Sequence, residues 1–143
     1  MINFSLLFNL YITMVSGIRN IHPEIKPYVQ EYRNVYADVC KEDLIMPDAY
    51  NFNITDYASG DYVGVCVFMG GVRNIEFRSD VWEYYDGHNR KMLVFHELSH
   101  CLLNKKHVDN TTNYMYPYLT DISDDVLYEQ VRKDMYGHCN KGI

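Results

Sequence analysis

The stretch FHELSHCLLNKKHVDN, residues 95–110, contains three of the six histidines of the chain. Apolar side chains recur through it at helical spacing, and this pattern predicts a buried helix over residues 89–103. His96 and His100 lie four residues apart, so on a helix both imidazoles can reach one metal ion. Glu97 projects beside them, where a carboxylate can accept a proton from a water molecule that a metal ion activates.

A metal site that performs chemistry requires a third protein ligand and one open position. His107 is the first candidate, because Asn104 tolerates the left-handed backbone conformation that ends a helix sharply and lets the chain turn back. Asp109, nearby, and Glu129, on the last expected helix, are the alternatives. The sequence therefore predicts one zinc ion, held by the two helical histidines and His107.

This stretch resembles the active site of the metzincin zinc peptidases. Their pattern is His-Glu-x-x-His-x-x-Gly-x-x-His, followed by a methionine turn. Asn104 stands for the glycine here, and both it and His107 come one residue late, as one extra helical residue would produce. The sequence TTNYMYPYLT, residues 111–120, resembles the methionine turn, and its MYPY segment is similar to the matrixin form.

The resemblance implies a site beyond the ligands. Met115 would lie beneath the zinc ion, and Tyr116, Pro117 and Tyr118 would line a substrate cleft. Tyr118 is by the same resemblance a candidate to stabilise the oxyanion. The chain also resembles small metallopeptidase-like proteins encoded by bacteria and phages, which combine a short apolar leader, a strand hairpin, a His-Glu-Leu-x-His-Cys helix and a late histidine.

The remainder of the chain predicts a single α+β domain. Residues 23–43 carry an apolar stripe at helical spacing, residues 50–57 alternate as a strand, and residues 62–68 and 74–78 flank a Gly70-Gly71 hairpin turn. Residues 123–137 predict a last helix, with Ser123 as its N-cap and Gly137 beyond its end. This order predicts a small twisted sheet, mostly antiparallel or mixed, that packs against an N-terminal helix, the histidine helix and a C-terminal helix.

The first fifteen residues carry no charged side chain, but the apolar run is too short and too interrupted to span a bilayer. Small residues follow at Ser16 and Gly17, where a signal peptidase could cut. We therefore expect residues 1–17 to be a leader and residues 18–143 to be the domain, in a secreted or cell-envelope protein. The alternative is a buried N-terminal strand or helix in a cytoplasmic or virion-associated protein.

The four cysteines are Cys40, Cys66, Cys101 and Cys139, and no two of them form a Cys-x-x-Cys pair. This spacing argues against a cysteine zinc knuckle. In an exported protein the cysteines would form one or two disulfides, and three pairings are open. In the cytosol they would be small buried apolar residues.

Composition narrows the class of function. Of the 143 residues, 48% are hydrophobic and 15% are aromatic, which is typical of a folded domain. A net charge of -6, without a run of basic residues, argues against nucleic acid and anionic membranes as partners. We expect a zinc peptidase, most simply an endopeptidase, that acts on peptides or proteins. One alternative is a zinc-stabilised binding or structural module, such as a virion or envelope component. The other is a peptidase that resembles the gluzincin type, with Glu129 as the third zinc ligand. Cleavage specificity and oligomeric state do not follow from the sequence.

Overall fold

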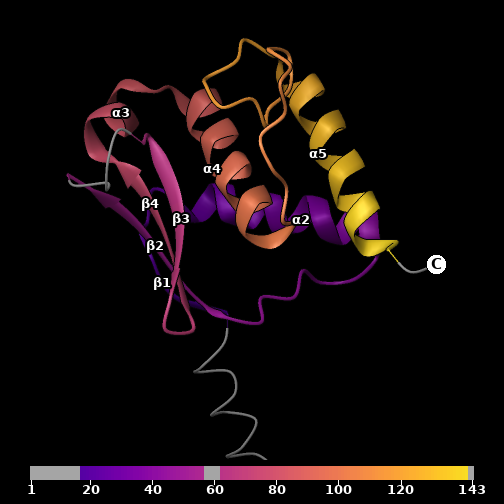
Figure 1. The fold of residues 1–143 in the computed structure, drawn as a ribbon, viewed down its shortest axis with the longest axis horizontal. Coiled ribbons are helices and arrows are strands. Elements are labelled where there is room, and N and C mark those ends of the chain that lie inside the picture. The colour runs from indigo at the N-terminus through magenta and orange to yellow at the C-terminus, as the bar shows by residue number, and fades with distance from the viewer. Residues whose placement is uncertain (1–16, 57–61, 142–143) are drawn as a thin grey trace, which may run out of the picture.

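The computed structural model describes residues 17–56 and 62–141 (Figure 1). Its elements, in chain order, are β1 (Gly17–Ile21), α2 (Lys26–Cys40), β2 (Ala49–Thr55), β3 (Gly64–Met69), β4 (Val72–Arg78), α3 (Ser79–Tyr84), α4 (Gly87–Leu102) and α5 (Asp124–Cys139). The fold is α+β, as the sequence predicts. The expected leader lies outside the described residues except for Gly17, which is the first residue of β1.

A four-stranded mixed sheet, in the order β1-β2-β4-β3, forms one side of the domain. The pairs β1–β2 and β2–β4 are parallel, and β3 returns antiparallel beside β4. The expected hairpin is confirmed: Gly70 and Gly71 make its turn with φ of 62° and 80°, values that favour glycine. The sequence did not predict β1 as a regular strand of this sheet. The order leaves β3 at an edge of the sheet, next to α4.

The alternation expected over residues 50–57 is found in β2, where it separates the two faces of the sheet. Phe52 pairs with Ile75 across the parallel β2–β4 ladder, and both side chains are fully buried. The neighbouring pair, Asn51 and Asn74, points to the opposite face, where the two amides form a hydrogen bond of 3.2 Å. The apolar core therefore lies between one face of the sheet and the helices.

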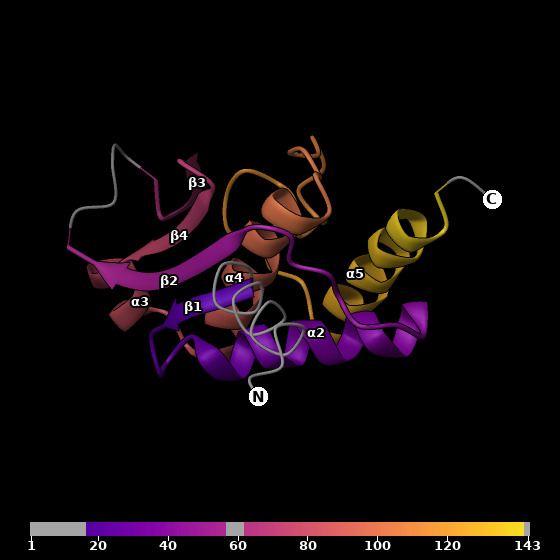
Figure 2. The same ribbon diagram turned by 90° about the horizontal axis from the view of Figure 1, so that it is seen from below.

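The helices α2, α4 and α5 lie to one side of the sheet in Figure 1, and Figure 2 shows α2 running beneath the others. The apolar stripe predicted for α2 is confirmed by the buried residues Ile25, Val29, Tyr32, Val35 and Tyr36. The ring of Tyr32 contacts that of Phe95 edge to face, with centroids 5.2 Å apart. Helix α2 thus supports α4 from the side away from solvent.

Side chains cap the N-termini of α4 and α5, whereas α2 and α3 start without a side-chain cap. Asp86 caps α4 by accepting from the Asn89 N–H at 2.8 Å, and Ser123 caps α5 as predicted, accepting from the Val126 N–H at 3.3 Å. The prediction that Gly137 lies beyond α5 is wrong, because the helix continues to Cys139. The stretch before α4 contains the short helix α3, which was not predicted from the sequence.

Two disulfides join the helices to other elements. Cys40 at the end of α2 bonds to Cys139 at the end of α5, and Cys66 on β3 bonds to Cys101 on α4. The first bond joins the last turn of α5 to the end of α2. The second ties the edge strand to the histidine helix. No helix in residues 17–56 or 62–141 has the length and apolar composition needed to cross a membrane.

The Cys40–Cys139 bond closes a long loop, since the two residues are 99 positions apart. Replacing both cysteines with serine should lower the free energy of unfolding by about 3–5 kcal/mol, because the unfolded chain regains the entropy that the closure removes. Urea denaturation of the variant and the wild type without reductant measures this loss. An unchanged midpoint would mean that the bond does not contribute in solution.

Candidate metal centre

The buried middle of α4 supplies three of the polar residues of the site. Phe95 and Leu98 are fully buried and fix the rotation of the helix against the core. This rotation places His96 and Glu97 in buried positions, and His100, one turn later, in a half-buried one. Burying such groups beside apolar surface is unfavourable unless they are paired or bind an ion.

A sharp turn after α4 delivers the third histidine. Asn104 adopts a left-handed conformation with φ of 54°, as the sequence predicts. The Lys105 N–H then donates to the Ser99 carbonyl oxygen at 3.0 Å, and the Val108 N–H donates to the Met115 carbonyl oxygen at 3.0 Å. The chain is thereby held on both sides of His107.

The structure brings the three expected histidines together. The ring centroid of His107 lies 5.3 Å from that of His96 and 4.7 Å from that of His100. One ligand atom from each of the three lies within 4.8 Å of the others. In the part of the chain that the structure describes, neither Asp109 nor Glu129 belongs to this group, and both are exposed. The cluster could hold one metal ion.

Backbone carbonyl groups orient the two helical imidazoles. The Nδ1 atom of His96 lies 2.8 Å from the carbonyl oxygen of Tyr114, and Nδ1 of His100 lies 2.6 Å from that of Lys105. A carbonyl oxygen can only accept, so each Nδ1 carries the hydrogen and donates it. Each Nε2 is then a bare acceptor in the neutral ring, which is the tautomer that binds a metal ion through Nε2.

The two bare Nε2 atoms lie 3.1 Å apart. They cannot form a hydrogen bond with each other, because neither carries a hydrogen in this tautomer. Burial lowers the pKa of His96 to about 4 and also lowers the pKa of His100, so neither ring gains a second proton at neutral pH. Tetrahedral ligands at 2.0–2.1 Å from zinc stand about 3.3 Å apart. The arrangement therefore fits a shared cation, which would remove the repulsion between the two lone pairs.

Glu97 lies at the side of this cluster, with its Oε1 atom 4.0 Å from Nε2 of His96. Burial raises the pKa of Glu97 to about 7. Strand β3 packs directly against this side chain: a methyl group on Gly64 would lie 3.2 Å from Cγ of Glu97 and 3.0 Å from Cδ1 of Phe77. The absence of a side chain at Gly64 therefore leaves the room that Glu97 occupies.

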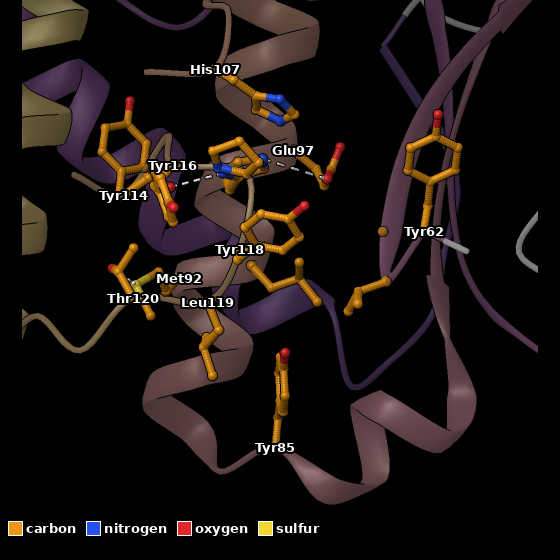
Figure 3. Close-up of a pocket in the computed structure, with 15 residues that line it drawn as sticks. Tyr62, Tyr85, Met92, Glu97, His107, Tyr114, Tyr116, Tyr118, Leu119 and Thr120 are labelled. Carbon is orange, nitrogen blue, oxygen red and sulfur yellow. Dashed lines mark hydrogen bonds and ion pairs between the residues drawn. The ribbon is translucent and has the colours of Figure 1, made fainter. Parts of the chain in front are cut away.

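A cavity of about 740 Å³ opens in front of the histidines (Figure 3). Glu97 points into it from α4, and the expected cleft residues Tyr116, Pro117 and Tyr118 line it from the following loop. Tyr118 is 75% exposed. Met115 is fully buried in the core.

The sequence did not identify the opposite wall of the cavity or the groups that orient the histidines. That wall includes Tyr62, before β3, and Tyr85, before α4. The carbonyl groups of Tyr114 and Lys105 give no sequence signal, because every residue has a carbonyl group. A large number of tyrosines, 14 in the chain, was the visible indication of an aromatic cavity.

Comparison of the chain with protein-family models, with characterised proteins and with solved structures gives no match. The geometry of the site therefore carries the functional argument.

Metal analysis distinguishes the ligands from the alternatives. His107→Ala should lower the affinity for zinc at least about tenfold, because one of the three candidate ligands is lost. Asp109→Asn and Glu129→Gln should each bind one zinc ion as tightly as the wild type. Dialysis against zinc followed by elemental analysis gives the stoichiometry, and chelator competition gives the affinity. Loss of zinc from either carboxylate variant, but not from the histidine variant, would contradict this ligand set.

Two glycine variants test the packing around Glu97. Gly64→Ala should lower the free energy of unfolding by about 1–3 kcal/mol, because the added methyl group meets Phe77 and Glu97. Gly137→Ala is the matched control, since it lies within α5 with nothing within 4 Å, and it should raise stability by about 0.5–1 kcal/mol. Chemical denaturation measures both, and equal effects of the two variants would rule out this close contact.

Proposed function

We propose that this protein is a zinc-dependent peptidase of the metzincin type. One zinc ion would be held by His96, His100 and His107, with Glu97 as general base. The observation that carries the proposal is the pair of bare Nε2 atoms 3.1 Å apart, beside a buried carboxylate and open to a cavity.

The donor set favours zinc. Three neutral imidazoles match the ligands that zinc takes in catalytic sites, where a fourth position stays open. His107 is exposed and the cavity adjoins the cluster, so solvent and substrate can reach this position. A bound zinc ion would polarise the carbonyl group of the substrate and lower the pKa of the attacking water.

Glu97 is suited to move a proton between water and the leaving amine. Its pKa, raised by burial to about 7, is close to the pH at which a general base works best. Near neutral pH the carboxylate can take the proton from the attacking water. The acid that results can return that proton to the amine when the peptide bond breaks. Tyr118, on the loop across the cavity, is the candidate donor to the oxyanion.

The edge strand β3 supports a peptide as the substrate. An extended peptide can add to the free edge of a sheet through backbone hydrogen bonds. Strand β3 is that edge, and Gly64 at its start packs beside Glu97. Binding along an edge strand requires no free chain terminus, which favours an endopeptidase.

Two local features support the metzincin assignment. Asn104 takes the left-handed conformation for which the metzincin pattern uses glycine. Met115 is fully buried, and its carbonyl oxygen accepts from the Val108 N–H, next to His107. The loop that contains Met115 thus supports the segment that contains His107, the proposed third ligand.

The disulfides support export as the cellular setting. Disulfides form and persist mainly in oxidising compartments, and the bonds Cys40–Cys139 and Cys66–Cys101 join separate elements. We infer that the protein folds outside the reducing cytosol, as a secreted or envelope protein.

Glu97→Gln tests the proposed activity. The variant should bind one zinc ion like the wild type but cleave peptides about 10²–10⁴-fold more slowly, because the amide cannot accept the proton. A broad peptide library analysed by mass spectrometry supplies the substrates. Chelation of the metal should also abolish cleavage by the wild type, and added zinc should restore it.

Glu129→Gln is the matched control, because the same change at an exposed position of α5 should leave the rate unaltered. Full activity of the Glu97 variant would contradict the role of this residue. A wild-type protein that binds zinc and cleaves no peptide in the library would instead support the zinc-stabilised structural module.

A further inference from the structure

We propose that Asp134, on α5, is a positioning residue for the metal centre. Its carboxylate holds the side chains of Tyr114 and Lys105, the two loop residues whose carbonyl groups orient His96 and His100. The inference rests on the proposed metal binding and assigns to the C-terminal helix a function in it.

The first branch runs through Tyr114. Its hydroxyl group donates to Oδ2 of Asp134 at 2.8 Å, and its carbonyl oxygen accepts from Nδ1 of His96 at 2.8 Å. Tyr114 is almost completely buried, so its phenol has little freedom to find another partner. Burial also raises the pKa of this phenol, which keeps it protonated as a donor.

The second branch runs through Lys105. Its ammonium group lies 3.3 Å from Oδ1 of Asp134, and its carbonyl oxygen accepts from Nδ1 of His100 at 2.6 Å. The Asp134 side chain is 19% exposed and that of Lys105 is 37% exposed, so this ion pair is shielded in part from solvent. Both branches have the same form: the side chain binds Asp134, and the backbone binds a histidine.

A chain of buried hydroxyl groups determines which group donates each hydrogen bond in the first branch. Tyr114 Oη lies 3.0 Å from Ser99 Oγ, which lies 3.1 Å from Tyr32 Oη. A phenol has one hydrogen, and a carboxylate can only accept. The Tyr114 hydroxyl therefore donates to Asp134, the Ser99 hydroxyl donates to Tyr114, and Tyr32 donates to Ser99. Asp134 is the terminal acceptor of this chain, which begins on α2 and passes through α4.

Helix α5 holds the same loop at a second point. Gln130, one turn before Asp134, accepts from the Tyr114 N–H at 2.9 Å and donates to the Thr112 carbonyl oxygen at 2.7 Å. Residues 103–123 lie between α4 and α5 and contain neither a helix nor a strand. The loop therefore depends on this face of α5 for its position, and Asp134 is the contact that reaches both orienting residues.

Removing the charge of Asp134 should make the positions of both the Tyr114 and the Lys105 carbonyl groups less well fixed. Without the charge, Lys105 loses its partner and the hydrogen bond from Tyr114 becomes weaker. The imidazoles of His96 and His100 would then be held less firmly in the tautomer and orientation that bind metal. Outer partners of this kind typically change metal affinity 10–100-fold, and Asp134 acts one step farther out.

The test compares Asp134→Asn with Asp125→Asn, the same change at an exposed position on the same helix. Chelator competition with zinc at one pH should show about tenfold weaker binding for Asp134→Asn and no change for the control. The visible spectrum of bound cobalt(II) should also change for Asp134→Asn alone, because the ligand geometry is altered. Denaturation of the metal-free proteins separates this effect from a loss of stability, which would leave the cobalt spectrum unaltered.

Two further variants test the branches separately and remain informative if Asp134→Asn does not fold. Tyr114→Phe and Lys105→Met keep the backbone carbonyl groups, and each should lose part of the zinc affinity. Wild-type affinity and an unchanged cobalt spectrum in Asp134→Asn, or in both branch variants, would overturn the inference. A wild-type protein that binds no zinc would instead overturn the proposed function.

Discussion

Two bare imidazole nitrogens 3.1 Å apart set the constraint on which the site depends. Two nitrogen lone pairs with no hydrogen between them repel each other at this distance. Here both rings are held in place by hydrogen bonds on their opposite sides. Each Nδ1–H donates to a backbone carbonyl group, so His96 and His100 cannot turn away from each other. The buried helix α4 fixes one end of each side chain, and the following loop fixes the other. A cation between the rings would offset the repulsion that the side chains alone leave uncompensated.

Burial gives the histidines and the carboxylate opposite shifts for one physical reason, the cost of removing charge from water. It lowers the pKa of His96, which keeps this imidazole neutral, and raises the pKa of Glu97, which suits this residue to exchange a proton near neutral pH. The same packing joins the walls of the cavity. Gly64 of β3 leaves the room that Glu97 occupies, and the Cys66–Cys101 bond connects that strand to α4. The hydrophobic core and the candidate site are therefore both built around helix α4.

Much of the architecture could be predicted from local patterns. The apolar stripe of α2, the hairpin turn at Gly70-Gly71 and the cap at Ser123 each depend on residues close together in the chain. Local patterns failed where distant residues dominate. Strand β1 is stabilised by pairing with β2, and α5 continues through Gly137 to Cys139, whose disulfide joins it to α2. Neither interaction has a signal within the segment itself.

The sequence by itself determined the three histidines, the carboxylate between two of them and the left-handed turn at Asn104, because helical spacing and backbone preference act over a few residues. Only the tertiary structure decided how these groups are held. It paired the cysteines, brought β3 against Glu97 and made Asp134 the support of the loop behind the histidines. Such contacts join positions far apart in the chain and often use backbone atoms, which every residue carries. The sequence therefore names the histidines of the candidate site, and the packing of α2, α4 and α5 positions them.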